Sequence, residues 1–256
     1  MDNRITDLLT RSGYTRTSEP RGAGQQLVVH AVAGAGKTTL LREILNTIPG
    51  VTIHTAGTPD PPNLTLNYIK GQEPPCAKKY AILDEYPARA KWPDENWDML
   101  IADNLQHTGP TTRPHYIKHT TYRLGPQTVK TLQSLGYCLE FQRRLEQPDQ
   151  GFSFTGLFDG PIYGQPITLD TSAHNLAIAH GLPALQATQT RGLEYDVTTI
   201  ISSTPLSAVK DKVGLYIAFT RHRRACHIRA PGRDPTCEQP TADGPATPPG
   251  QTSRQH

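Results

Sequence analysis

A short glycine-rich segment of this sequence has the residues needed to hold a chain of phosphates. Ala33-Gly34-Ala35-Gly36-Lys37-Thr38-Thr39 follows an apolar run at 27–31 and opens a helical pattern at 38–46. Glycines let backbone N–H groups approach phosphate oxygens, and a helix N-terminus adds unpaired N–H donors. Lys37 suits the β- and γ-phosphates and Thr38 suits Mg²⁺. The segment therefore predicts a phosphate-binding loop whose seven residues, 33–39, contact a nucleotide.

The surroundings of Lys37 decide the strength of this signal. Gly-Lys-Thr by itself is expected by chance in about one chain in eight of this length, so the alternative is an ordinary turn with a surface lysine. The strand before it and the helix after it favour the phosphate loop. Ala31 stands where the general pattern begins with glycine, which reduces turn freedom but leaves the phosphate-facing residues unchanged.

Two adjacent carboxylates, Asp84 and Glu85, follow the apolar run 80–83. Ligands of open α/β sheets bind at the carboxyl ends of the strands, so this pair is expected beside the phosphate loop. Phosphoryl transfer to water needs a metal partner and a group that orients or deprotonates the water. We expect Asp84 to hold Mg²⁺ and Glu85 to act as the base. The alternative is a solvated pair on the surface.

Three later residues could complete a hydrolytic site. Gln106 ends the segment Ala102-Asp103-Asn104-Leu105-Gln106, and Arg123 and Arg221 lie beyond a proline-rich stretch at 109–114. Arginines stabilise the charge that develops on a transferred phosphoryl group. Each arginine alone would more often be a surface residue, whereas for Gln106 a plain surface glutamine is the less favoured alternative. The order of these residues after Lys37 is what favours catalysis.

Apolar runs and helical patterns alternate along the chain, which predicts an α/β fold with parallel sheets. The expected strands are 27–31, 51–54, 80–83, 99–102, 116–120, 166–170, 197–201 and 226–229, and the expected helices are 38–46, 127–135, 173–180 and 212–220. Because of the break at 109–114, we divide the chain into an N-terminal extension, two lobes of similar size and a disordered Pro/Gly-rich tail. These parts are 1–24, 25–114, 115–230 and 231–256.

The composition is that of a soluble globular protein with a mild positive charge. The 256 residues are 36% hydrophobic and 19% charged, with a net charge of +3. No stretch approaches the roughly 18 apolar residues of a membrane span, and no signal peptide is visible. Cys76, Cys138, Cys226 and Cys237 lack zinc-ligand spacing, so reduced thiols are expected. We expect a cytosolic protein that reaches membranes through partners.

Taken in order, these segments resemble the motifs of superfamily 1 helicases. The segment ending at Gln106 is similar to the motif Gly-Asp-x-x-Gln, with Ala102 in place of glycine. Segments 121–125, 188–195 and 215–221 resemble the fourth, fifth and sixth motifs. The resemblance covers about residues 26–230. It implies two RecA-like lobes with the nucleotide between them, and hydrolysis of ATP or another NTP with Mg²⁺.

A stand-alone helicase core of this size is similar to the triple-gene-block movement helicases of potexvirus-like plant viruses. The resemblance implies binding of single-stranded RNA, cell-to-cell movement of viral RNA and suppression of RNA silencing. It also implies a homo-oligomer in the host cytoplasm, recruited to plasmodesmata. The partners it implies are the viral capsid protein, the other triple-gene-block membrane proteins and the host silencing machinery.

Several residues are candidates for contact with RNA. Basic clusters bind the phosphate backbone with salt-dependent affinity, although 221–224 could equally be a solvated face. Trp92 and Trp97 could stack on bases, but we favour partial burial against the sheet. The five candidate RNA contacts are Thr55, Thr190, Arg191, Arg223 and Arg224.

Two other functions are compatible with these residues. The departures at Ala31 and Ala102 leave room for a non-motor, self-associating RNA-binding scaffold with weak ATPase activity. A small P-loop kinase is the second, although it would not explain the ordered motifs around Arg123 and Arg221. Stimulation of hydrolysis by RNA distinguishes a motor from a kinase.

Overall fold

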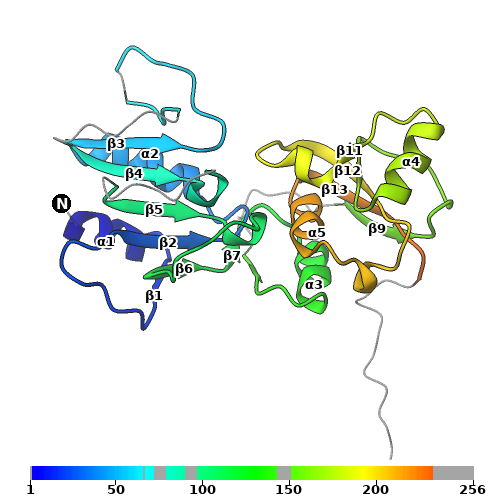
Figure 1. The fold of residues 1–256 in the computed structure, drawn as a ribbon, viewed down its shortest axis with the longest axis horizontal. Helices are drawn as coiled ribbons and strands as arrows, with labels where there is room; N and C mark the ends of the chain where they lie inside the picture. The colour runs from blue at the N-terminus through cyan, green and yellow to red at the C-terminus, as the bar shows by residue number, and fades with distance from the viewer. Residues whose placement is uncertain (1, 66, 72–78, 90–96, 143–150, 233–256) are drawn as a thin grey trace, which may run out of the picture.

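The computed structural model describes residues 2–65, 67–71, 79–89, 97–142 and 151–232. Within these residues the chain forms two parallel sheets with helices, arranged one after the other along the longest axis (Figure 1). Trp92, Cys76, Cys237 and the tail from residue 233 lie outside the described residues. The α/β fold with parallel sheets that the sequence predicts is confirmed.

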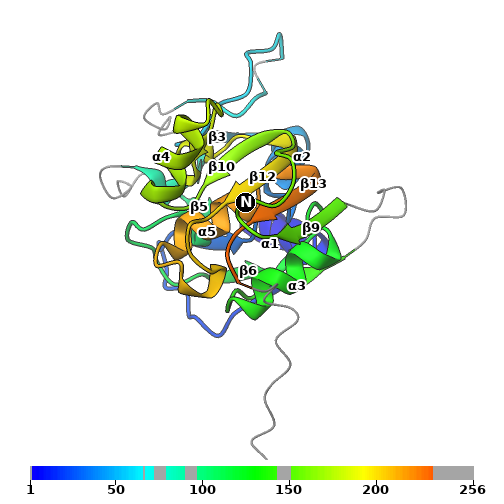
Figure 2. The same ribbon diagram turned by 90° about the vertical axis from the view of Figure 1, so that its right-hand side faces the viewer.

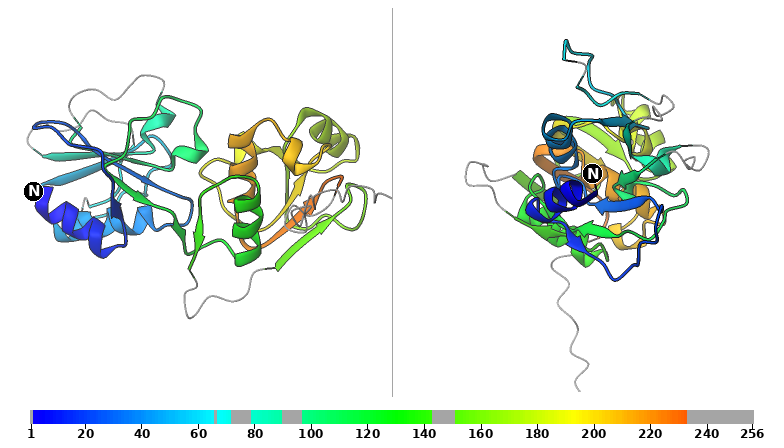
Figure 3. Two further views of the ribbon diagram at one scale, coloured as in Figure 1. Left: turned by 90° about the horizontal axis from the view of Figure 1, so that it is seen from below. Right: turned by 90° about the vertical axis from the view of Figure 1, so that its left-hand side faces the viewer.

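The first sheet has six strands in the order β1-β6-β2-β5-β4-β3, and all neighbours are parallel except β1 and β6. Its strands are β1 (Thr15–Arg16), β2 (Leu27–Ala31), β3 (Val51–Thr55), β4 (Tyr80–Asp84), β5 (Met99–Ala102) and β6 (Tyr116–Lys118). All residues of β2, β3 and β5 are buried, as expected for parallel strands covered on both faces. Helices α1 (Asp2–Arg11) and α2 (Lys37–Thr47) lie on the same side of this sheet (Figure 3, left).

The second sheet has five parallel strands in the order β11-β10-β12-β13-β9. Its strands are β9 (Gly151–Thr155), β10 (Gln165–Thr168), β11 (Leu185–Gln186), β12 (Tyr195–Ile201) and β13 (His222–Arg229). Helices α3 (Pro126–Ser134) and α5 (Lys212–Phe219) lie between the two sheets, and α4 (Thr171–Ala179) lies beyond the second one (Figures 1 and 2). The short strands β7 (Thr120–Thr121) and β8 (Glu140–Phe141) pair with each other in parallel.

The change from one sheet to the other differs from the boundary expected after residue 114. Strand β6 pairs with β2, Val29 opposite Tyr116, so the chain leaves the first sheet only between Lys118 and Thr120. The proline-rich segment therefore connects β5 to β6, which are two strands of the same first sheet. A proline-rich crossover and a proline-rich linker have the same composition, so sequence could not separate them.

The first 24 residues are also part of the first sheet's structure. The side chains of Ile5 and Leu9 on α1 are 0% exposed, and β1 extends the sheet by pairing with β6. Ile5, Leu8 and Leu9 on α1 have helical spacing, whereas the two-residue strand β1 has no periodicity to detect.

In the described part of the chain, no helix combines the length and the apolar character needed to cross a membrane. Cys138 is exposed and Cys226 is buried, and both are free thiols.

Candidate active site

A cavity of about 470 Å³ lies at the carboxyl ends of the first sheet's strands. Its other side is lined by residues from the part of the chain after β6, among them Arg123, Glu194 and Arg221. This edge of a parallel sheet is where α/β proteins bind ligands. All five of the sequence-predicted catalytic residues line this cavity. The lining residues are Ala33, Gly34, Gly36, Lys37, Thr38, Thr39, Glu85, Gln106, Tyr122, Arg123, Gly192, Glu194 and Arg221.

The glycine-rich loop has the backbone conformation that a phosphate site needs. Gly34 and Gly36 have left-handed φ angles of 74° and 89°, and α2 begins immediately afterwards at Lys37. A Cβ atom on Gly34 would lie 2.6 Å from the Cβ of Arg123 and 2.6 Å from Thr121 Oγ1. Glycine at this position therefore allows the segment that carries Arg123 to pack directly against the loop.

The ammonium group of Lys37 lies over the loop. Its Nζ donates hydrogen bonds to the carbonyl oxygens of Ala31 and Val32, at 3.1 and 3.5 Å. The departure from glycine at position 31 leaves this carbonyl in place. Carbonyl oxygens are weaker partners for an ammonium group than phosphate oxygens, so Lys37 is free to transfer to a phosphate chain.

Asp84 ends β4 with one oxygen atom satisfied and one available. Its Oδ2 accepts a hydrogen bond from Thr55 Oγ1 at 3.3 Å, whereas its buried Oδ1 has no hydrogen-bond partner among the described residues. Burial and the neighbouring charge of Glu85 raise the pKa of Asp84. An unsatisfied buried carboxylate oxygen is costly, and a hard cation would satisfy it. The residues present therefore fit a Mg²⁺ ion.

Glu85 has an unusual backbone conformation and a well-defined partner. Among the described residues other than glycine, it alone has a positive φ angle, 53°. Such conformations are unfavourable and gather at functional sites. Its Oε2 lies 2.8 Å from Nε2 of His107, which is buried. Burial alone would raise the pKa of Glu85, but the His107 hydrogen bond and the charge of Lys37 outweigh it and lower that pKa.

His107 is a site residue that sequence reasoning missed. Its position directly after Gln106 was the only available signal, because the motif that ends in glutamine does not specify the next residue. The structure gives it a positioning role, since its ring holds the carboxylate of Glu85 at the edge of the cavity.

A chain of buried hydrogen bonds links the phosphate loop to Arg221. The backbone N–H of Ala33 donates to the hydroxyl of Tyr216 at 2.9 Å, and this hydroxyl donates to Asp103 Oδ2 at 3.0 Å. Gln106 Nε2 donates to the same Oδ2 at 2.7 Å, and Arg221 Nη2 donates to Gln106 Oε1 at 3.2 Å. Gln106 and Arg221, which sequence reasoning proposed separately, are thus in direct contact.

Arg221 is a buried arginine whose hydrogen bonds in the structure go to neutral oxygens. Its guanidinium donates to the carbonyls of Thr190, Leu193 and Ile217, as well as to Gln106 and Thr220. Burial and the nearby charge of Arg123 lower the pKa of Arg221 to about 10, so it remains charged at neutral pH. Its charge therefore remains available to an anion in the cavity.

Arg123 reaches the cavity from the loop after β7. Its Nη1 forms an ion pair with Glu194, and its Nη2 donates to the carbonyl of Thr220 at 2.9 Å. The other oxygen of Glu194 accepts a hydrogen bond from Arg223 Nε at 2.9 Å. Both predicted arginines thus lie at one cavity with the phosphate loop.

This arrangement agrees with the comparison against known protein families. Residues 27–230 match the family described as the viral superfamily 1 RNA helicase core domain. The chain belongs to this family of viral helicases. Members are NTP-hydrolysing enzymes, and the site described above has the parts for that reaction.

Curated relatives of this helicase are movement and silencing proteins of potexviruses. The chain is 50% identical over 229 residues to the movement and silencing protein TGBp1 of Foxtail mosaic virus, covering 89% of this chain and 96% of that protein. It is 42% identical over 232 residues to TGBp1 of Plantago asiatica mosaic potexvirus, with coverages of 91% and 98%. The TGBp1 of Potato virus X (strain HB) is 35% identical over 218 residues, with coverages of 85% and 94%. The helicase is therefore a member of the TGBp1 movement and silencing family.

Solved helicase structures share the fold. The PRRSV helicase matches with a TM-score of 0.56 and 17% identity, covering 80% of this chain and 52% of that one. The arterivirus nonstructural protein 10 helicase, solved as a complex with DNA, matches with a TM-score of 0.57 and 17% identity, covering 84% and 63%. The chain thus spans about half to two thirds of the length of these helicases.

Two of the residues expected to contact RNA, Thr55 and Thr190, are buried in the helicase. The side chain of Thr55 is buried and bonded to Asp84, and that of Thr190 is 0% exposed and bonded to the carbonyl of Ala187. Neither side chain is exposed to RNA in this structure. Both residues contact site residues instead: the Thr55 hydroxyl donates to Asp84, and the Thr190 carbonyl accepts a hydrogen bond from Arg221. A motif assigns a threonine to a loop but does not determine which way its hydroxyl points.

The three arginines expected at RNA are exposed in the helicase: Arg191, Arg223 and Arg224. Trp97 is buried against the first sheet, with its ring edge to face with that of His54, as the preferred interpretation predicted.

The buried hydroxyl of Tyr216 offers a direct test of the link between the two sheets. We expect Tyr216→Phe to lower the free energy of unfolding by about 1–3 kcal/mol, because the N–H of Ala33 loses its acceptor in a buried place. Chemical denaturation measures this change. Tyr137→Phe is the matched control, since its more exposed hydroxyl bonds the carbonyl of Lys212, and should change stability by about 0.5 kcal/mol or less. Equal effects of the two changes would contradict the link.

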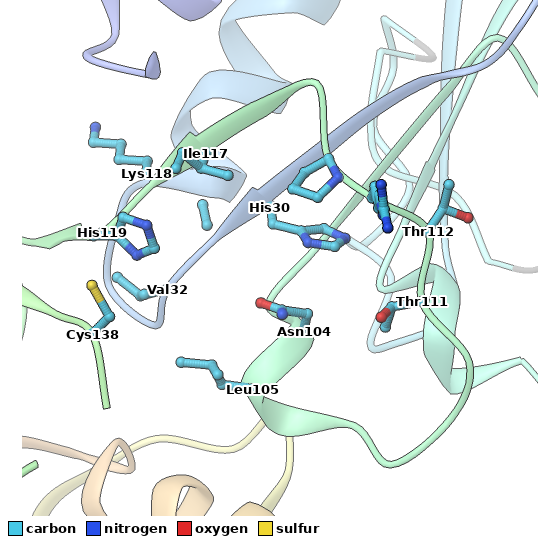
Figure 4. A pocket seen from close by; sticks show the side chains of 13 residues that line it. His30, Val32, Asn104, Leu105, Thr111, Thr112, Ile117, Lys118, His119 and Cys138 are labelled. Atoms are coloured by element: carbon cyan, nitrogen blue, oxygen red, sulfur yellow. The ribbon is translucent and has the colours of Figure 1, made fainter. Parts of the chain in front are cut away.

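A second cavity, of about 360 Å³, lies at the same junction of the helicase (Figure 4). Asn104 and Leu105 reach it from the segment before Gln106, and Cys138 reaches it from the chain before β8. Burial and the charge of Lys37 lower the pKa of His30, which also lines this cavity, to about 4, so its ring is neutral. The cavity lacks the acidic pair and the loop glycines, and it is lined mainly by neutral side chains.

Proposed function

We propose that this protein hydrolyses ATP or another NTP, with Mg²⁺, in the cavity of Lys37 and Glu85, and that the cycle drives movement along single-stranded RNA. The observation that carries this proposal is the hydrogen-bond chain from Ala33 through Tyr216, Asp103 and Gln106 to Arg221. It joins the groups that would bind the phosphates to the arginine that would stabilise their transfer.

Each residue has a role that its surroundings support. The loop 33–39 and Lys37 bind the phosphates, and Thr38 and Asp84 hold Mg²⁺, which when bound neutralises phosphate charge. Glu85, held by His107, accepts the proton of the attacking water. Gln106 lies beside Arg221, where it senses the terminal phosphate. Arg221 and Arg123 stabilise the negative charge that develops on the transferred group.

We assign the two sheets to two RecA-like lobes with the nucleotide between them. The phosphate loop and the acidic pair come from the first sheet, and Arg221 precedes β13 of the second. Binding of a triphosphate would draw both arginines towards it and close the lobes. Reopening after hydrolysis would change the grip on RNA.

The names of the relatives extend the proposal to the biology of infection. We infer that the protein supports cell-to-cell movement of viral RNA and suppression of RNA silencing in the host cytoplasm, with recruitment to plasmodesmata. The partners would be the capsid protein, the other triple-gene-block membrane proteins, the host silencing machinery and further copies of this chain. Arg191, Arg223 and Arg224 are the exposed residues that would contact RNA.

The experiment is steady-state ATP hydrolysis with and without single-stranded RNA. We expect RNA to stimulate the wild type, and Lys37→Ala to lower the rate about a hundredfold or more, because the phosphate chain loses its positive partner. Lys130→Ala on α3 is the control, since Lys130 is exposed and outside the cavity, and it should hydrolyse like the wild type. A wild type no faster than Lys37→Ala would exclude the motor and favour the scaffold.

A further inference from the structure

One carboxylate, that of Glu194, binds two arginines that have different proposed roles. Arg123 holds Oε1 and Arg223 holds Oε2. Arg123 and Glu194 line the nucleotide cavity, whereas the side chain of Arg223 is 59% exposed and faces solvent beside it. Glu194 therefore lies between the place proposed for phosphates of the nucleotide and a place proposed for phosphates of RNA.

Glu194 is ionised and its charge is compensated by these two partners. Partial burial would raise the pKa of Glu194, but Arg123 and Arg223 outweigh it and lower that pKa. The positive charge of Arg221 also lowers the pKa of Glu194, by a smaller amount, although the hydrogen bonds of Arg221 go to neutral oxygens. Removing one partner arginine leaves the carboxylate with the other.

We propose that Glu194 is a shared acceptor through which bound nucleotide and bound RNA weaken each other's binding. The inference rests on the proposed function, because it assigns Arg123 to the nucleotide and Arg223 to RNA. A nucleotide that binds Arg123 breaks the ion pair of Arg123 with Glu194, and Glu194 keeps its ion pair with Arg223. RNA that binds Arg223 breaks the second ion pair, and Glu194 keeps the first. When both are bound, Glu194 loses both partners, and this loss opposes joint binding.

Such coupling is reciprocal and has a consequence for a motor. If nucleotide weakens RNA binding by some factor through Glu194, RNA weakens nucleotide binding by the same factor. The contact of Arg223 with RNA would then be weaker in the nucleotide-bound state and stronger after release. Glu194 acts as a positioning residue and does not itself bind either ligand.

The test measures the affinity for a dye-labelled single-stranded RNA by fluorescence anisotropy, with and without a saturating non-hydrolysable ATP analogue and Mg²⁺. The quantity compared is the ratio of the two Kd values, with analogue over without. We expect Glu194→Gln to lower this ratio roughly two- to fivefold, the size typical of a partly exposed ion pair. Arg223→Gln should lower it similarly, because RNA then no longer competes for Glu194.

Arg224→Gln is the matched control, since Arg224 is the next residue, is exposed, and has no bond to Glu194 in the structure. It should weaken RNA binding in both conditions and leave the ratio unchanged. The reciprocal ratio, nucleotide Kd with RNA over without, should change by the same factor in each variant, which general damage to the fold would not reproduce.

An unchanged ratio in Glu194→Gln would overturn the inference and leave the proposed function intact. If that variant did not fold, Arg223→Gln would decide in the same way. A wild type that bound no RNA or no nucleotide would instead overturn the proposed function, and the inference with it.

Discussion

Replacing Arg221 with alanine is expected to lower kcat for ATP about a thousandfold, the lower end of the effect measured for arginines that stabilise phosphoryl transfer. The guanidinium is buried and remains charged, and its hydrogen bonds within the described residues go to neutral oxygens, so no carboxylate is bonded to it directly. A buried charge of this kind acts strongly on the transition state. Steady-state kinetics at saturating ATP measure the loss.

Arg221 also supports its surroundings, so the test needs a second variant. Its bonds to the carbonyls of Thr190 and Leu193 hold the loop before β12, and their loss could unfold that part. Arg221→Lys keeps the charge but has fewer donors, and should retain part of the activity. Thermal unfolding of both variants separates loss of fold from loss of catalysis. A folded Arg221→Ala protein with the wild-type kcat would show that the proposed cleft between two lobes is not the catalytic site.

Glu85→Gln is expected to lower kcat about a hundredfold to ten-thousandfold while nucleotide still binds. Glutamine has nearly the same shape and can still bond His107, but it cannot accept a proton from water. The substitution leaves Lys37 and the loop proposed to bind phosphate unchanged. Single-turnover hydrolysis together with binding of a fluorescent ATP analogue measures the two properties separately.

The matched control for that change is Glu140→Gln, at an exposed position on β8 outside the cavity. It should hydrolyse at the wild-type rate. If Glu85→Gln were as active as this control, another group would have to be the base. If it failed to bind nucleotide, its role would be in binding, and the unusual φ angle of Glu85 would have to be explained by the shape of the loop alone.

Local sequence determined the central strands of the first sheet and the phosphate loop. The strands around 27–31, 51–55, 80–84 and 99–102 are apolar runs bounded by turns, and the phosphate loop follows the first of them directly. These features depend on residues close in the chain, so periodicity and spacing predict them. Gly34 and Gly36, Lys37 and the Asp84–Glu85 pair were identified for the same reason.

Tertiary structure alone decided which distant residues meet. Gln106 contacts Arg221, the hydroxyl of Tyr216 bonds Asp103, and Glu194 pairs with Arg123, and these contacts join positions 71 to 115 residues apart. The same holds for β6, which joins the first sheet although it follows the proline-rich segment. No periodicity records such pairings, because they depend on how two sheets and their helices pack. The direction of a side chain is likewise set by packing, which is why the hydroxyls of Thr55 and Thr190 lie buried at the site.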